Sequence, residues 1–306
     1  MKKYHISNIF GLEISGHADL DFVDVAINAD TKLFIDPCFI ETSNDLFSIR
    51  CQEVIQDYFD SLYKAYRISS YNPYILSHLG ERNETRFGYG TGTNGKAKTP
   101  EGMGETLNEL HDLIIRGVTF HGMIDIPLMM PRFAEDCMSD MLVNILYKQL
   151  SEFTLMQCDR YGIATSPITE LRYYWNHHTH EWCVYEGRSL VINGSIILLV
   201  PKKYVCTRFY YSTSQFFMSK IATMLQKDRT EVVNRKTIVP TKLDIRECEL
   251  KACGSLVDAV RVHTQNMPFL LSDYHCNMGN AYANRAMKDT ALDWLVYGSI
   301  NKNTPA

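Results

Sequence analysis

We predict an α+β fold for this chain of 306 residues from three patterns in its sequence. Residues 22–28, FVDVAIN, alternate apolar and polar side chains, as a strand with one buried face does. Residues 135–161 run without an internal Gly or Pro, which is typical of a long helix. Residues 171–202 are rich in aromatic and β-branched side chains and contain turn signals. These patterns predict a mixed, partly antiparallel sheet with flanking helices, followed by a helical C-terminal part.

The first third of the chain is predicted to alternate strands with helices. A second strand, 32–36, follows the strand at 22–28 through a hairpin turn. A helix is expected over 44–67, with Ser43 or Asn44 as its cap. A short polar strand at 84–89 precedes a glycine-rich segment. The next helix runs from the cap Thr99 to about Arg116, with Pro100 in its first turn, and residues 121–131 connect it to the long helix.

The remaining two thirds combine antiparallel strands with helices. The long helix stops at Gly162, a residue suited to a helix end. Three antiparallel strands follow, with turns at NHHT and NG. Helices are expected over 212–226, 241–264 and 284–298, with a break at Pro268. We divide the chain into an α+β main domain, 1–230, and a helical subdomain, 231–306, although one continuous domain also fits.

Composition and charge exclude several classes of protein. The chain is 45% hydrophobic and 22% charged, which is ordinary for a globular protein. No run of about 18 apolar residues is present, so we expect no membrane span. The nine cysteines include no C-x-x-C pair and predict reduced thiols in a cytoplasmic protein. A net charge of -4 argues against a basic nucleic-acid coat, but residues 202–251 lean basic, either as solvated helix surface or as a face that meets phosphates.

The glycine-rich segment matches the first seven positions of the phosphate-binding loop G-x-x-x-x-G-K-[ST]. Ala97 stands where a magnesium-binding hydroxyl is required, and the preceding strand is polar, so an NTPase loop is not favoured. Two alternatives remain, a surface loop and a lid that contacts a phosphate or a nucleic-acid backbone. The substrate-binding residues predicted for the lid are Arg86, Gly90, Gly92, Gly95, Lys96 and Lys98.

Polar residues on the long helix and at two strand ends are the candidates for catalysis. Asp136, Asp140 and Asn144 are spaced by four, so they share one helix face. They either cap and brace the helix or line a cleft in which Asp140 binds a hard cation. Asp36 and Lys202 follow apolar strands. The set is comparable to the acid–acid–lysine sites of magnesium nucleases, although Val200 stands where the (D/E)-x-K pattern needs an acid.

The predicted catalytic residues are Asp36, Asp140, Asn144 and Lys202, and the predicted ligands of Mg²⁺ or Mn²⁺ are Asp36, Asp140 and Glu152. The simpler interpretation is that the acidic residue lies in a turn and that the lysine faces solvent at the end of its strand.

A histidine-rich turn offers a different metal. His177, His178, His180 and Cys183 have the residue types of a zinc site. Neighbours in a hairpin turn seldom converge on one ion, so a solvated turn is favoured. Cys276 beside His275 is the one local thiol–imidazole pair, and adjacency alone is weak evidence for a nucleophile.

Three segments, TKLFIDP, FAEDCMSDMLVNIL with its following LSEFT, and ILLVPKKYV, resemble those of an uncharacterised bacterial protein family. In that family a strand ending in Asp-Pro precedes a glycine-rich loop, a helix with Ser-Asp-Met and a strand ending in Pro-Lys. The resemblance covers about two thirds of the chain. It implies a bacterial cytosolic protein of mobile or defence-associated gene sets, with no established activity.

We therefore predict a divalent-metal-dependent phosphodiester hydrolase, a nuclease-type effector of an intracellular bacterial system such as phage defence. The alternative is a non-catalytic sensor or assembly module that binds a partner protein or a nucleotide. The expected partners are accordingly nucleic acid, nucleotide or another protein, and no membrane.

Overall fold

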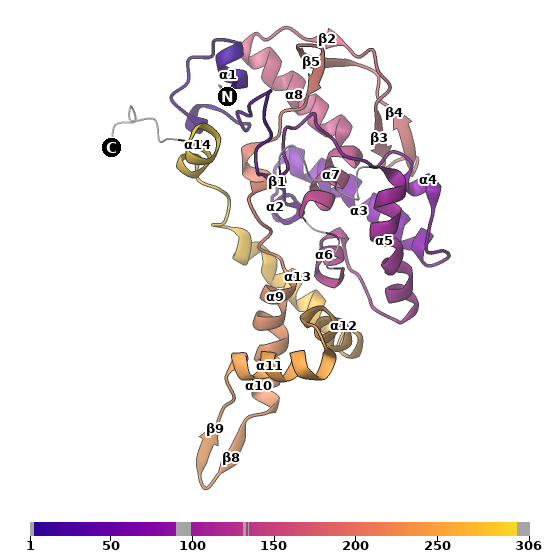
Figure 1. Cartoon of the computed structure of the whole chain (residues 1–306), viewed down its shortest axis with the longest axis vertical. Helices are drawn as coiled ribbons and strands as arrows, with labels where there is room; N and C mark the ends of the chain where they lie inside the picture. Colours follow the sequence, from indigo (N-terminus) through magenta and orange to yellow (C-terminus); the bar gives the residue numbers. More distant parts are fainter. Residues whose placement is uncertain (1–2, 90–98, 131–132, 134, 299–306) are drawn as a thin grey trace.

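The computed structural model describes residues 3–89, 99–130, 133 and 135–298, and it confirms an α+β fold (Figure 1). The glycine-rich residues Gly90, Gly92, Gly95, Lys96 and Lys98 lie outside the described residues. No helix in the described ranges is long and apolar enough to cross a membrane. The elements up to residue 145 are α1 (Ile6–Ile9), η1 (His17–Asp19), β1 (Phe34–Ile35), α2 (Pro37–Glu41), α3 (Leu46–Tyr66), α4 (Pro73–Leu76), α5 (Pro100–Ile115), η3 (Met123–Asp125), α6 (Ile126–Met129) and α7 (Glu135–Ile145).

The second half contains most of the strands and the C-terminal helices. Its elements are α8 (Tyr147–Tyr161), β2 (Ser166–Pro167), β3 (Tyr173–Asn176), β4 (Glu181–Val184), β5 (Arg188–Ile192), β6 (Ser195–Ile197), η4 (Lys202–Tyr204), β7 (Val205–Cys206), α9 (Thr213–Phe216), η5 (Phe217–Ile221), α10 (Ala222–Asp228), β8 (Glu231–Val233), β9 (Lys236–Ile238), α11 (Lys242–Cys253), α12 (Leu256–Asn266), α13 (Phe269–Tyr282) and α14 (Asp289–Tyr297).

The core is built around α3, which contacts α4, α5, α7 and α8. Its apolar side chains recur at helical spacing, so one face is continuously buried. The helix is capped by Asp45, whose side chain accepts a hydrogen bond from the Ser48 N–H. The helix predicted over 44–67 is confirmed, with the cap one residue beyond the position we expected. The buried face consists of Ser48, Cys51, Val54, Ile55, Tyr58, Phe59, Leu62 and Tyr66.

The hairpin predicted from 22–28 and 32–36 is wrong. β1 forms within 32–36, but it pairs antiparallel with β7, far along the chain. Residues 22–28 make only isolated bridges, from Phe22 to Pro201 and from Ala26 to His5. The polar strand expected at 84–89 is likewise reduced to a bridge between Phe87 and Thr31. Residues 22–26 are all buried, Asp24 included, so the alternation did not mark a single buried face. Long-range partners decided the pairing.

The long helix predicted over 135–161 is two helices. α7 ends at Ile145 and α8 begins at Tyr147, with Leu146 between them at φ -93° and ψ 14°. The predicted stop is confirmed, because Gly162 ends α8 in the left-handed region at φ 65°. The break turns α7 against β1 and β3 while α8 packs on β5.

In the residues that the structure describes, the strands form small antiparallel sheets and no large central sheet. The orders are β1-β7, β2-β5-β6, β3-β4 and β8-β9 within the described chain. Turns at NHHT and NG join β3 to β4 and β5 to β6, as predicted, but four strands replace the expected three. Residues 121–131, expected to be a connector, contain η3 and α6.

The C-terminal part is helical, as predicted, and carries a projecting hairpin (Figure 1). Ser212 caps α9 as expected, and the helix continues through the π-helical turn η5 into α10. The single helix expected over 241–264 is divided by Gly254, at φ 84°, into α11 and α12. The exposed hairpin β8–β9 was not predicted. The division into domains 1–230 and 231–306 stays a prediction.

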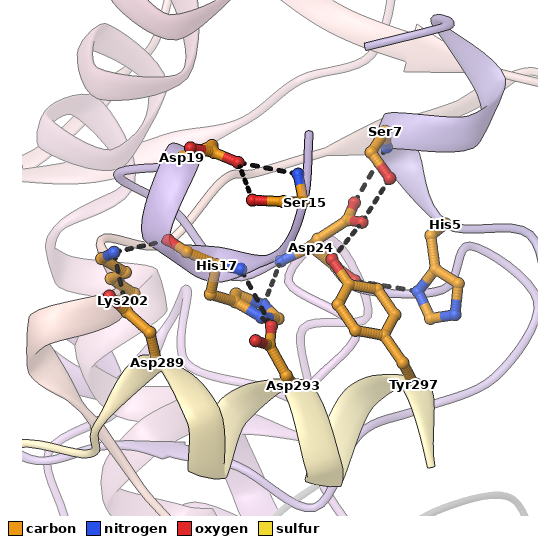
Figure 2. A network of polar contacts seen from close by, with 10 residues as sticks. All are labelled: His5, Ser7, Ser15, His17, Asp19, Asp24, Lys202, Asp289, Asp293 and Tyr297. Carbon is orange, nitrogen blue, oxygen red and sulfur yellow. Dashed lines mark hydrogen bonds and ion pairs between the residues drawn. The ribbon is translucent and has the colours of Figure 1, made fainter. Parts of the chain in front are cut away.

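The last helix, α14, returns to the beginning of the chain and packs beside η1 (Figure 2). Asp293 accepts hydrogen bonds from the backbone N–H and the ring Nδ1 of His17, at 2.8 and 2.7 Å. Tyr297 donates to the buried carboxylate of Asp24 at 2.8 Å. These contacts tie the two ends of the described chain together.

Candidate functional site

The structure places Asp36 inside the core as a helix cap. Its side chain is 1% exposed, and Oδ1 accepts a hydrogen bond from the Cys38 N–H at 2.9 Å. Burial raises the pKa of this carboxyl to about 6, against the hydrogen bond from Cys38. Pro37 then occupies the first helical position of α2. The Asp-Pro pair that we interpreted as a strand end is therefore also a helix start.

Asp140 and Asn144 are brought together on α7, as their spacing predicted. Asn144 is fully buried, and its Nδ2 donates to the carbonyls of Gly80 and Asp140 at 2.8 and 2.7 Å. Its Oδ1 accepts from Arg82 Nε at 2.6 Å. Burial, and then the charge of Asp136, raise the pKa of Asp140 to about 8. Asn144 thus holds the segment around Arg82 against α7.

Lys202 and Glu152 have partners elsewhere. Lys202 Nζ lies 2.7 Å from Asp289 Oδ1 and donates to the His17 carbonyl at 2.5 Å. Glu152 forms an ion pair with Arg50 on the surface. Of the predicted catalytic and metal-binding residues, only Asp140 and Asn144 are joined by a direct hydrogen bond in the described chain.

The histidine-rich turn is arranged as a hairpin with scattered partners. His180 Nδ1 lies 2.6 Å from Asp57 Oδ1, whereas the rings of His177 and His178 are tilted by 42° with centroids 3.9 Å apart. In the described ranges, no group of three or more His, Cys, Asp or Glu side chains is placed to hold a metal ion.

A cavity of about 250 Å³ lies where α2, α3 and α13 meet the segment before η3. Glu41, the last residue of α2, and His275, from the middle of α13, both line it. The remaining lining residues are Gln52, Ile55, Gln56, His121 and Gly122. We call this cavity the Glu41–His275 pocket.

A buried carboxylate orients the imidazole of His275. Asp125 is 0% exposed, and its Oδ1 lies 2.9 Å from His275 Nε2. The same Oδ1 accepts from the Tyr211 hydroxyl, and Oδ2 accepts from the His121 N–H, each at 2.8 Å. Burial alone would lower the pKa of His275, but the hydrogen bond and charge of Asp125, with the charge of Glu41, raise it above its ordinary value.

The carboxyl group of Glu41 is the second ionisable group of the pocket. Within the described residues its carboxylate has no hydrogen-bond or ion-pair partner. Burial raises its pKa to about 7, opposed by the charge of His275 and assisted by the charges of Asp125 and Asp36. Such a carboxyl exchanges its proton near neutral pH, as a general acid or base must.

Gly122 keeps the space between the two groups open. A Cβ atom at this position would lie 3.8 Å from Glu41 Oε1 and 3.9 Å from His275 Cε1. Both reactive groups therefore surround one point, which an atom of a bound molecule can occupy. A pocket that combines two perturbed ionisable groups with a buried orienting partner is a candidate active site.

Sequence reasoning missed most of this site. His275 drew attention only as a neighbour of Cys276, which is exposed and lies outside the pocket lining. Glu41, Asp125 and His121 stand in no recognisable motif. The one available signal was the presence of two polar residues, His121 and Asp125, in an otherwise apolar connector.

The fold and the pocket define an α+β protein with an oriented histidine and a protonatable glutamate at a cavity. The chain belongs to the family described as a domain of unknown function (DUF8370), which matches residues 11–212. No curated protein and no solved structure matches the chain significantly. Glu41 and Asp125 lie in the matched range, whereas His275 lies beyond it.

Proposed function

We propose that this protein is a hydrolase that works by general acid–base catalysis in the Glu41–His275 pocket. The observation that supports the proposal is a Glu41 carboxylate that has no partner among the described residues, beside an imidazole that buried Asp125 holds in place. Structural ion pairs satisfy all their members, whereas this arrangement leaves one carboxylate for a bound molecule.

The two groups suit the two proton transfers of a hydrolysis. Ionised Glu41 accepts a proton from water as the water oxygen attacks the substrate. The His275 imidazolium donates its proton to the leaving atom, so one water is consumed and the two products carry its atoms. Proton exchange with solvent then restores both groups. Catalysis of this type contributes about 10²–10⁴ in rate.

A phosphodiester is the bond we propose for cleavage. The pocket lining contains two histidines, His121 and His275, and a single acidic side chain. An imidazolium next to the reacting centre stabilises the negative charge that develops on a phosphoryl group. In this proposal the side chains of Glu41 and His275 carry out both proton transfers.

Glu41→Gln and His275→Asn test the proposal, with bis(p-nitrophenyl) phosphate and single-stranded RNA and DNA as substrates. We expect either variant to lower kcat at least 100-fold and to remove one limb of the pH–rate profile. Glu53→Gln, which changes an exposed glutamate on α3, is the matched control. Full activity in Glu41→Gln, or no turnover of these substrates by the unaltered protein, would contradict the proposal.

A second candidate function is the metal-dependent hydrolase predicted from the sequence, with a divalent ion bound at Asp140. Burial and the charges of Asp136 and Glu81 raise the pKa of Asp140 to about 8. Mg²⁺ or Mn²⁺ would relieve this like-charge repulsion. Asp136 lies close to Gly88, because a Cβ on Gly88 would be 3.5 Å from its Oδ1. Asp36 and Glu152 are engaged elsewhere, so this version retains only Asp140 from the predicted ligands.

Thermal melts with millimolar MgCl₂ or MnCl₂ separate the two candidates. A metal-bound site predicts a rise in Tm for the unaltered protein and none for Asp140→Asn. If metal does not change the Tm and the unaltered protein turns over none of these substrates, the non-catalytic sensor or assembly module is favoured. A role inside a bacterial cell, in phage defence, rests on the resemblance of three sequence segments and is proposed on that ground.

A further inference from the structure

A groove between α3 and α8 is separate from the Glu41–His275 pocket and has a different chemistry. Its volume is about 470 Å³, within the range of small-molecule sites. α3 contributes three side chains, α8 contributes four, and the segment 201–203 closes one side. The lining consists of Asp21, Asp45, Leu46, Phe47, Arg50, Gln149, Glu152, Phe153, Met156, Pro201, Lys202 and Lys203.

Aromatic rings form the apolar part of the groove. Phe47 packs edge-on to Phe153, with centroids 5.7 Å apart, and stacks on Tyr204 at the same distance. Beside these rings, Leu46 and Met156 are 74% and 54% exposed. Exposed apolar side chains that adjoin an aromatic floor indicate a surface that another molecule covers.

The charges at the rim are balanced. Three cationic and three anionic side chains line the groove, and each has an ion-pair partner. Lys203 pairs with Asp45 at 2.7 Å, and Arg50 pairs with Glu152. Lys202 and Asp21 are held by groups outside the lining, Asp289 and Arg160. A charged ligand would have to displace one of these partners, so the rim favours a neutral one.

Gln149 provides a polar group in this apolar setting. Its side chain is 6% exposed and lines the groove. Oε1 is buried and has no hydrogen-bond partner, although an unsatisfied buried acceptor costs about 1–3 kcal/mol. Oε1 is out of contact with solvent, so the amide would have to rotate about its last side-chain bond to turn this atom toward the groove. A ligand N–H or O–H would then satisfy the acceptor.

We infer that this groove binds a neutral, flat aromatic molecule that carries an N–H or O–H donor. The ring lies against Phe47 and Phe153, Met156 covers it, and the donor bonds Gln149 Oε1. This inference does not depend on the proposed hydrolase activity, because the groove and the Glu41–His275 pocket share no lining residue.

Indole and benzothiophene test the inference as a matched pair, because the rings have nearly the same shape and only indole carries an N–H. Titration of the full chain by NMR or calorimetry should show saturable binding of both, with indole about 10-fold tighter. In Gln149→Leu the two affinities should become equal. 1-Naphthoate serves as the anionic probe and should bind more weakly than indole.

Filling the groove provides an independent check. Met156→Trp should weaken both ligands at least 10-fold, whereas Leu171→Trp, an exposed change outside the groove, should leave them unchanged. Thermal melts establish that each variant is folded. Equal affinities in the unaltered protein, tighter binding of 1-naphthoate, or no saturation at millimolar probe would overturn the inference. The last result would also be expected if the groove accepts only a protein partner.

Discussion

Two histidine–aspartate pairs in this molecule have similar contact distances, through different ring nitrogens, and different surroundings. His17 lies 2.7 Å from Asp293, and His275 lies 2.9 Å from Asp125. His17 is 0% exposed, and its Nε2 accepts from the Asp24 N–H at 3.1 Å, so Nδ1 carries the proton (Figure 2). The ring of His275 borders a cavity, and its Nδ1 has no hydrogen bond within the described chain.

The difference shows that a histidine–aspartate contact does not define a catalytic site. Around His17 both ring nitrogens and the neighbouring carboxylates are satisfied by the chain, which leaves nothing for a ligand. Around His275 the described part of the chain leaves one ring nitrogen and the Glu41 carboxylate without a hydrogen bond at a cavity. Completed hydrogen bonding indicates a structural role, and incomplete bonding next to space indicates a functional one.

The largest effect is expected for Asp24→Ala. The Asp24 side chain is fully buried and accepts from the Ser7 N–H at 2.9 Å, the Ser7 hydroxyl at 2.5 Å and the Tyr297 hydroxyl. Removing it leaves three donors unsatisfied, so the free energy of unfolding should fall by about 3–5 kcal/mol in urea titrations. Asp60→Ala, on the exposed face of α3, is the control. A loss below about 1 kcal/mol would show that this network is not structural.

Glu41→Gln should make the protein more stable near and above neutral pH, whereas Asp24→Ala makes it less stable. The folded pKa of about 7 lies above the unfolded value, so between about pH 4.3 and 7 the folded chain holds a proton that the unfolded chain has lost. The unaltered protein therefore loses up to about 1.4 kcal/mol of stability per pH unit across this window. The variant should match it at pH 4 and exceed it above pH 7. Parallel stability curves in urea from pH 4 to 8 would mean that Glu41 is not perturbed.

The smallest effect is expected for Tyr297→Phe. This change removes one hydrogen bond to Asp24 and keeps the ring that packs on His5 and His17. Since the two hydrogen bonds from Ser7 remain, the loss should be about 1 kcal/mol. Calorimetric melts measure it. Activity at the Glu41–His275 pocket should be unchanged. A large drop in kcat would mean that the Asp24 network and this pocket are coupled, although we treat them as independent.

Local chemistry explains which parts of the fold the sequence predicted. Thr99, Ser212 and Gly162 cap helices where expected, because capping involves only a few neighbouring residues. The partner of β1 was not predictable, since Val205 and Cys206 lie about 170 residues further along the chain. Strand pairing at that separation depends on the whole core and leaves no local signal.

The candidate site was even less accessible from sequence. Glu41 ends a short helix, Asp125 lies in an apolar connector and His275 lies beyond the range matched by the family. Only folding brings α13 against α2. The Asp140–Asn144 pair was predicted correctly as neighbours because helical spacing fixes it. We selected Asp36 because it follows a strand. An aspartate before a proline can also cap a helix, and this is the role that Asp36 has.

The docking of α14 on η1 has a consequence for protein synthesis. The ribosome makes residues 5–24 before residues 289–297, yet part of the hydrogen bonding of His17 and Asp24 comes from Asp293 and Tyr297. Until that helix has been translated, the nascent chain cannot complete its N-terminal segment. A chain that ends before residue 289 lacks Asp293 and Tyr297, so His17 and Asp24 lose the hydrogen bonds that these two side chains make.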